Sequence, residues 1–243
     1  MIVHMKITLL HAFNDIIGNI LNLLYPPRCY GCTRSLDVFS REVLCAACAE
    51  DIKQRSWLSN RVVTCHSHEN SPLPNHYFDA LHYVSAYEGV IRECMHNFKY
   101  KGRLMLERVF GKLLVEYAER YLDTKNVDWI IPVPLHRIKK KERTFNQAEV
   151  LASIVARRFN VRMLRHSLIR IRMGQPQVAL PKQKRVAGIR NSFMVRHPYI
   201  LRHRNILLID DVFTTGATAN ECARVIKEAG AKRVEVLTLA KST

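Results

Sequence analysis

Apolar residues recur along this chain with two periods, one typical of helices and the other of strands. In residues 106–121 and 148–159 they return every three or four positions, which predicts two amphipathic helices, the second ending at Asn160. Residues 77–87 alternate loosely and residues 127–133 are mostly apolar, which favours two strands. Because strands and helices follow one another, the pattern predicts an α/β fold with a parallel sheet flanked by helices.

The pattern is sharpest after residue 205. Residues 206–209 form a short apolar strand, Asp210 and Asp211 stand at its predicted carboxyl end, and a turn of small residues leads directly into a helix. Gly230 is placed to cap that helix. We interpret its apolar face as core packing, formed by Cys222, Val225, Ile226 and Ala229.

The chain before residue 76 differs in composition. Residues 1–24 carry apolar side chains at helical spacing, which predicts an amphipathic docking helix; a membrane-surface anchor is the alternative, disfavoured because Lys6 supplies nearly all its positive charge. A polar stretch near residues 69–76 marks a boundary. We therefore expect three parts, namely 1–24, a cysteine-containing segment 25–75, and an α/β domain 76–243.

Four cysteines in two CxxC pairs give the first chemical signal. Twelve residues separate the pairs, so two knuckles can converge on one tetrahedral centre, formed by Cys29, Cys32, Cys45 and Cys48. Four thiolates suit a structural Zn²⁺, which substitutes for the core that so short a segment lacks. We expect the segment to share no core with the larger domain, so that loss of zinc unfolds residues 25–60 alone.

Disulfide pairing and a site that has lost its metal are the alternatives. A disulfide is disfavoured because no secretory signal is visible, and the same observation predicts a cytoplasmic protein. Cys65, His66 and His68 offer a second ligand set, but their polar, proline-containing context favours a linker. No stretch reaches the roughly 20 apolar residues of a membrane helix, so we expect no stable membrane insertion.

The turn after Asp211 has the composition of a phosphate site. Threonine hydroxyls and the free N–H groups of a helix start attract a phosphate, and Gly216 permits close backbone approach. Two adjacent carboxylates beside a phosphate need another partner, which sugar hydroxyls or Mg²⁺ would supply. The residues therefore predict a site for a phosphorylated sugar.

Charge adds a class of partner. The chain has 38 Lys and Arg against 21 Asp and Glu, giving a net charge of +17 and a pI near 9.9. No acidic residue lies between Glu149 and Asp210, an interval rich in arginine. Such a surface favours phosphates and nucleic acid as partners; a merely solubilising cationic face is the alternative.

Residues 206–218 resemble the phosphoribosyl pyrophosphate (PRPP) signature of type I phosphoribosyltransferases. Further motifs are PheLysTyr at 98–100, ProValProLeuHis at 132–136 and PheAsnGlnAla at 145–148. Together with the four cysteines after ProPro, they resemble the ComF family of competence proteins in order along the chain. One departure is Thr144, where that family usually has glycine.

The resemblance implies a type I phosphoribosyltransferase-like domain with an N-terminal zinc finger. It implies that Asp210 and Asp211 hold the ribose hydroxyls with Mg²⁺, and that residues 214–218 bind the 5′-phosphate. The implied PRPP-binding set is Asp210, Asp211, Val212, Thr214, Thr215, Gly216, Ala217 and Thr218. The pyrophosphate would face Arg137, Lys139, Lys140 and Arg143, with Arg137 and Arg143 joining the two aspartates as catalytic residues. Residues 170–185 lie where such enzymes carry a mobile loop.

Three functions follow as hypotheses. The first is a PRPP-binding protein of DNA uptake that handles single-stranded DNA and meets the uptake machinery. The second is an active nucleobase phosphoribosyltransferase of nucleotide salvage, and the third is a zinc-dependent interaction module with a regulatory PRPP site. The sequence names no acceptor for a transfer reaction, so catalytic turnover stays open at this point.

Overall fold

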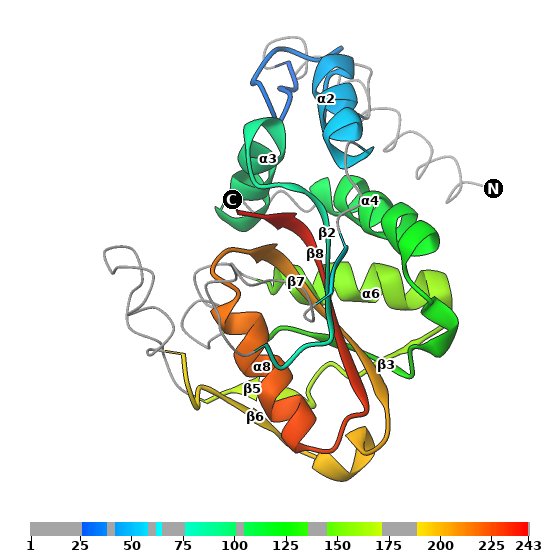
Figure 1. Cartoon of the computed structure of the whole chain (residues 1–243). Helices are drawn as coiled ribbons and strands as arrows, with labels where there is room; N and C mark the ends of the chain where they lie inside the picture. The colour runs from blue at the N-terminus through cyan, green and yellow to red at the C-terminus, as the bar shows by residue number, and fades with distance from the viewer. Residues whose placement is uncertain are drawn as a thin grey trace, which may run out of the picture.

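A six-stranded sheet forms the centre of the structure. It is seen in the computed structural model, which describes residues 26–37, 42–57, 62–64, 76–100, 105–135, 145–171 and 189–242. The strand order is β1-β2-β8-β7-β3-β4 (Figure 1). From β2 to β4 the neighbouring strands run parallel, and β1 pairs antiparallel with β2 at one edge. The predicted parallel α/β architecture is confirmed.

Short helices and strands alternate along the described chain. The strands of the main sheet are β1 (Val62–Thr64), β2 (Ala80–Ala86), β3 (Trp129–Pro132), β4 (Arg162–Met163), β7 (Asn205–Phe213) and β8 (Arg233–Lys241). A separate antiparallel pair consists of β5 (Leu168–Arg170) and β6 (Phe193–Val195). The helices are α2 (Ala46–Trp57), α3 (Gly89–Tyr100), α4 (Leu106–Tyr121), η1 (Thr124–Asn126), α6 (Gln147–Phe159), η3 (Pro198–Leu201) and α8 (Ala217–Glu228).

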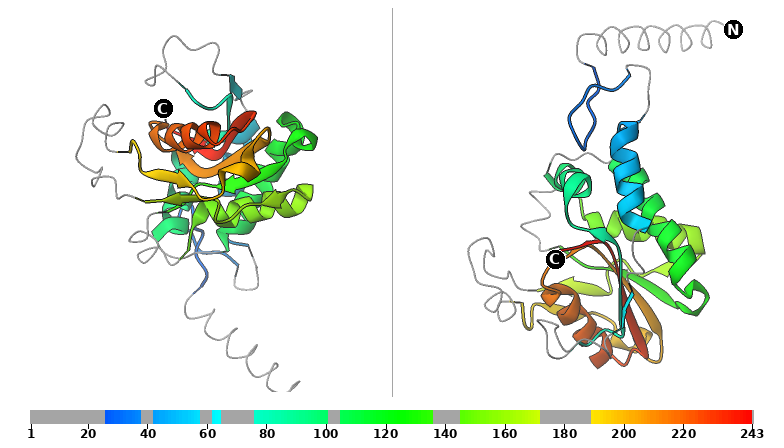
Figure 2. Two further views of the ribbon diagram at one scale, coloured as in Figure 1. Left: turned by 90° about the horizontal axis from the view of Figure 1, so that it is seen from below. Right: turned by 45° about the horizontal axis from the view of Figure 1, so that its top comes forward.

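Helices cover both faces of the sheet, and β7 runs through the middle of the resulting core. Leu207 and Ile209 belong to the buried cluster that includes α4 and α6, whereas Ile206 and Leu208 belong to the cluster around α8. Figure 2 shows the sheet between these two helical layers. Because side chains alternate along a strand, burial on both faces explains why residues 206–209 are all apolar.

Several predicted boundaries are confirmed. The helix expected over 106–121 is α4, and the next helix ends with Asn160 in the left-handed region at φ 53°. Gly230 follows α8 with φ 93°, as a C-terminal cap requires. The strand expected over 127–133 is shorter, at Trp129–Pro132, although the amides of Asp128 and Val133 on either side also donate to carbonyls of β7.

The prediction that Asp210 and Asp211 follow their strand is wrong. β7 continues to Phe213, so both aspartates lie inside it. The reason is the partner strand β8, which stays paired with β7 as far as Lys241. The end of the strand that carries the predicted site therefore lies four residues later than the apolar run suggests.

The expectation that the cysteine segment shares no core with the larger domain is also wrong. Cys29 and Cys48 are buried in the same cluster as Ile91, Met95 and Phe98 of α3. α2 adds Ile52, which is 2% exposed. Figure 1 shows α2 lying above α3 and α4, and one apolar core therefore joins the cysteine segment to the sheet.

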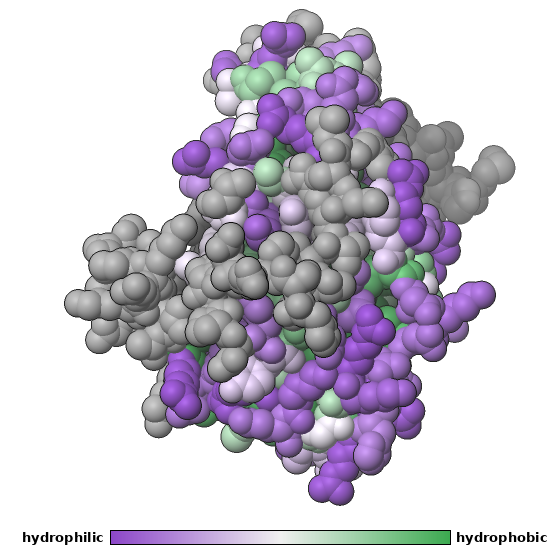
Figure 3. Space-filling view, in the orientation of Figure 1, coloured by the Kyte–Doolittle hydropathy of each residue, from purple (hydrophilic) through white to green (hydrophobic). Residues whose placement is uncertain are grey.

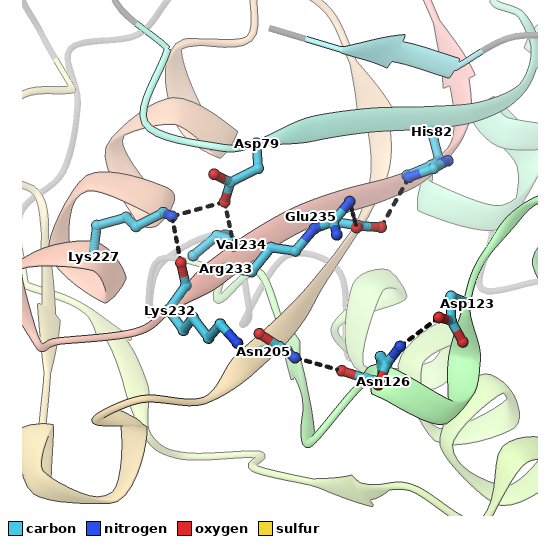
Figure 4. Close-up of polar contacts among 10 residues, drawn as sticks. All are labelled: Asp79, His82, Asp123, Asn126, Asn205, Lys227, Lys232, Arg233, Val234 and Glu235. Carbon is cyan, nitrogen blue, oxygen red and sulfur yellow. Dashed lines mark hydrogen bonds and ion pairs between the residues drawn. The ribbon is translucent and has the colours of Figure 1, made fainter.

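Polar contacts hold the amino-terminal edge of the sheet (Figure 4). Asp79 accepts a hydrogen bond of 2.7 Å from the amide of Val234 and pairs with Lys227 at 2.8 Å. Glu235 lies 3.0 Å from Nε2 of the buried His82. These contacts tie β2 to β8 and α8 at the end opposite Asp210, so this network is structural.

Some predicted features lie outside the described residues. They are the helix over 1–24, the residues Cys65, His66 and His68, the basic residues Arg137, Lys139, Lys140 and Arg143 together with Thr144, and residues 172–185 of the expected loop. Among the described helices, none combines the length and apolar character needed to cross a bilayer.

Candidate functional site

The loop between β7 and α8 has the geometry of an anion-binding turn. Gly216 adopts φ 74° in the left-handed region, which L-residues adopt at a cost, and α8 begins at the next residue. The N-cap residue Gly216 has no side chain that could accept from the helix, and N–H groups of the first turn face the loop. The hydroxyl of Thr215 bends back to accept from the amide of Ala217 at 3.4 Å. The predicted order of strand, threonine turn and helix start is confirmed.

The two aspartates beside this loop occupy different environments. Neighbouring strand residues point to opposite faces, so Asp210 shares its side of the sheet with Cys222 and Arg170, while Asp211 faces α3. Burial, followed by the charge of Asp211, raises the pKa of Asp210 to about 7, against a smaller lowering effect of Lys99. The pair therefore changes its charge near neutral pH.

Lys99 forms an ion pair with Asp211, a contact that sequence reasoning missed. Its Nζ lies 2.8 Å from Oδ2 of Asp211, and the two side chains are only 14% and 13% exposed. The sequence places Lys99 in the PheLysTyr motif, far from the aspartates along the chain. Adjacent helical residues point in different directions, so the buried Phe98 beside it gives no sign that Lys99 is buried, and nothing in the spacing identifies its partner.

The other sequence motifs meet at this end of the sheet. Phe98 packs against Phe145 with tilted rings whose centroids are 5.4 Å apart, which joins the PheLysTyr and PheAsnGlnAla motifs. Asn146 donates to the carbonyl of Val133 at 3.0 Å and accepts from the amide of Ala148, capping α6. These two motifs are thus the frame that holds α3, β3 and α6 around β7.

Arg170 stands at the edge of the site. Its guanidinium lies over the ring of Phe193 at 5.3 Å, and burial lowers its pKa despite the nearby charge of Asp210. Arg170 is where the predicted mobile segment starts, so the structure brings the first residue of that segment near Asp210. Arg137 and Arg143, the other predicted cationic residues, lie outside the described ranges.

The four predicted cysteines converge as a metal centre requires. Their four Sγ atoms lie within 4.8 Å of one another, and the Cys32 and Cys45 sulfurs are 3.7 Å apart. Tetrahedral Zn²⁺ with bonds of about 2.3 Å places its sulfurs about 3.8 Å apart, so the four residues fit this ion. The donor set, Cys29, Cys32, Cys45 and Cys48, is that of a structural zinc site.

Backbone amides prepare this centre for a cation. Sγ of Cys29 accepts from the amides of Gly31 at 3.4 Å and Cys45 at 3.3 Å. Burial opposes ionisation of Cys29, but these donors and the amide of Cys32 outweigh it and lower its pKa to about 6. Burial and the neighbouring thiols raise the pKa of Cys48. Zinc binding must therefore displace protons from the cluster.

We expect zinc removal to destabilise the whole chain, because the metal centre and the sheet share one core. A loss of about 2 kcal/mol lowers Tm by roughly 4–8 °C in a chain of this size. The chain has two tryptophans, Trp57 on α2 and Trp129 on β3. Trp57→Phe and Trp129→Phe each keep one tryptophan, whose fluorescence follows the unfolding of its own region. Thermal unfolding of both variants, with and without chelator, therefore reports the two regions separately. An unchanged Trp129 transition after metal loss would contradict this prediction.

Asp210 should make stability depend on pH. Its raised pKa means that the folded protein keeps a proton that the unfolded chain releases, so this contribution to the free energy of unfolding falls from about pH 4 to about pH 7. Asp210→Asn should therefore gain stability relative to the wild type across that window. Urea unfolding at pH 5, 6 and 8 measures the difference, with Glu50→Gln on α2 as the control for loss of one carboxylate. Parallel curves for wild type and Asp210→Asn would overturn the assignment.

Two domain families match the chain. The phosphoribosyl transferase domain family matches residues 146–242, which contain β7, its loop and α8. The double zinc ribbon domain family matches residues 20–60, which contain the four cysteines. The two matches therefore fall on the two sites described above.

Curated relatives resemble most of the chain. Competence protein F of Haemophilus influenzae is 25% identical over 88% of this chain and 97% of its own length. DNA utilization protein YhgH of Salmonella typhimurium is 25% identical over 90% of this chain and 99% of its own length. Competence protein ComFC of Streptococcus pneumoniae is 27% identical over 65% of this chain and 66% of its own. With a four-cysteine zinc ribbon joined to a phosphoribosyltransferase domain, this chain belongs to the ComF family.

Proposed function

We propose that this protein binds PRPP with Mg²⁺ at the carboxyl end of β7 and acts in the uptake and handling of single-stranded DNA in the cytoplasm. The observation that carries the first part is the start of α8 directly after Gly216, at Ala217, separated by five residues from the acidic pair of β7. A phosphate suits the helix start, and ribose hydroxyls suit the carboxylates.

The loop and the acidic pair would bind different parts of the ligand. Residues 214–218 would hold the 5′-phosphate through N–H groups and hydroxyls, while Asp210, Asp211 and the adjacent Val212 would face the ribose. Mg²⁺, when bound with PRPP, would supply positive charge for the pyrophosphate. Lys99 already balances one carboxylate, so the site meets its anionic ligand with less negative charge than two free aspartates would present.

A transfer reaction is the second candidate, favoured by the phosphoribosyl transferase domain match. Breaking the C1–pyrophosphate bond leaves positive charge on the ribose and negative charge on the leaving group, which fixed cations and carboxylates at this edge would stabilise. Arg137 and Arg143 are the residues we propose for the leaving group. Release of pyrophosphate from PRPP, assayed across a panel of nucleobases, separates an enzyme from a binding protein.

PRPP binding should depend on the acidic pair. In isothermal titration with Mg²⁺ present, Asp211→Asn should weaken PRPP binding about 10-fold or more, equivalent to about 1.4 kcal/mol, because a ribose partner is lost. Gly216→Val should weaken it as well, since a β-branched residue at φ 74° distorts the loop. Asp123→Asn, beside η1 at the opposite edge of the sheet, is the matched control. No heat of binding with the wild type would remove the proposal.

An exposed cationic segment at the amino edge suits single-stranded DNA. Arg196, Tyr199 and Arg202 all face solvent, and Tyr199, which is 67% exposed, contacts His197 edge to face. The described surface around η3 is mostly hydrophilic (Figure 3). Arginine can follow the phosphates of a strand while a tyrosine stacks on a base. Because η3 precedes β7, this segment lies at the opposite end of the sheet from the proposed PRPP site.

Two kinds of substitution should distinguish phosphate contacts made by arginine from base stacking by Tyr199. Arg196→Gln and Arg202→Gln should each reduce the slope of log K against log salt by about 0.7, whereas Tyr199→Ala should cost about 1–3 kcal/mol without changing the slope. Fluorescence anisotropy with a labelled single-stranded oligonucleotide at 50–200 mM salt measures both, and Lys112→Gln on α4 is the control. Wild-type binding that ignores salt would argue against DNA handling, and unaffected variants would exclude this surface.

A further inference from the structure

Helix α3 contacts the zinc ribbon on one side and the acidic pair of β7 on the other. Near its start, Val90 packs so closely on the first CxxC knuckle that a Cβ on Gly31 would lie 2.7 Å from its Cγ1. Near its end, Asn97 donates to the carbonyl of Tyr30 at 2.7 Å. Two residues later, Lys99 pairs with Asp211. Asn97 and Lys99 lie in the last turn of α3 on opposite sides of the helix, so the helix stands between the two sites.

The buried side of α3 is tightly packed. Ile91, Cys94, Met95 and Phe98 are each at most 1% exposed, and all four share a cluster with Cys29 and Cys48. Interiors packed at this density do not deform continuously, so a shift of the ribbon must move α3 or open a cavity beside it. Either change alters where Lys99 stands relative to Asp211.

We propose that α3 couples the four-cysteine centre to the phosphoribosyl site, with Lys99 as the positioning residue at its end. This proposal rests on the PRPP binding proposed above. An occupied metal centre holds the knuckle of Cys29 and Cys32 against Val90 and Asn97, and α3 then keeps the ammonium of Lys99 on Asp211. Without the ribbon's support, the carboxylate loses its counter-charge and repels the phosphates of the ligand.

Thermodynamic linkage makes the coupling reciprocal. If metal occupancy strengthens PRPP binding by some factor, PRPP must strengthen metal binding by the same factor. The two effects can therefore be measured with independent readouts, one at each site, and neither depends on catalytic turnover.

The first experiment measures both directions with the full chain. Titration calorimetry compares PRPP–Mg²⁺ binding by the wild type and by Cys32→Ser, whose residue is the exposed member of the cysteine cluster. Competition with the chromogenic chelator 4-(2-pyridylazo)resorcinol measures the zinc affinity of the wild type with and without PRPP–Mg²⁺. We expect PRPP–Mg²⁺ to raise that affinity about fivefold or more, and Cys32→Ser to lose PRPP affinity by a similar factor.

The second experiment tests the path through the helix. Lys99→Met should abolish the effect of PRPP on zinc affinity, Lys99→Arg should restore part of it, and Lys112→Met on α4 should leave it unchanged. Asn97→Ala removes the hydrogen bond between α3 and the ribbon. A double-mutant cycle of Asn97→Ala with Lys99→Met should give a non-additive loss of PRPP affinity, because both residues act through one helix.

The possible outcomes distinguish the coupling proposed here from the PRPP binding on which it rests. Absence of PRPP binding to the zinc-loaded wild type defeats the proposed function. PRPP binding that leaves zinc affinity unchanged, or that Lys99→Met and Asn97→Ala weaken additively, overturns the coupling and leaves the function standing. If Lys99→Met lowers Tm but PRPP still raises the zinc affinity of this variant by the full factor, Lys99 has only a structural role.

Discussion

The two-residue period of β7 is the constraint from which the site follows. Residues 206–209 of this strand are buried alternately on the two faces of the sheet, which fixes the strand's orientation. The next two side chains therefore point to opposite faces. Asp210 is thereby turned to the face of α8 and Asp211 to the face of α3. Two identical side chains, adjacent in sequence, become a carboxyl that titrates near neutral pH and a carboxylate paired with a lysine.

The zinc ribbon and the phosphoribosyltransferase domain form one structural unit. Short metal-bound segments are commonly stabilised by the ion because their own apolar side chains are too few. Here Val43, Leu44 and Ile52 do not form a separate core, since they are buried with α3 and α4. The metal centre therefore fixes one wall of the larger core, and α3 is the element that belongs to both parts.

The sequence predicted the local features of this site well. The threonine turn, the helix start and the four-thiolate centre depend on residues close together in the chain, where spacing alone restricts the geometry. Strand ends were less predictable, because the extent of β7 depends on pairing with β8 rather than on its own composition. The Lys99–Asp211 pair could not be predicted, since it joins residues 112 positions apart whose contact arises from the way α3 packs on the sheet. The common core was missed for the same reason, as no periodicity shows which helix will cover a CxxC knuckle.

The surface proposed for DNA and the loop proposed for PRPP lie at opposite ends of β7, which has a physical consequence. Both ligands are polyanions, and charges separated by more than about 8 Å of solvent are largely screened at physiological ionic strength. A DNA strand bound along η3 would therefore not compete electrostatically with a phosphate at the start of α8, since the nine residues of β7 separate the two places. Because β7 begins at the first surface and ends at the second, communication between them requires movement of a strand packed on both faces. The proposed DNA surface and the proposed sugar-phosphate site would thus act independently, whereas the shared core and α3 connect the metal centre to β7.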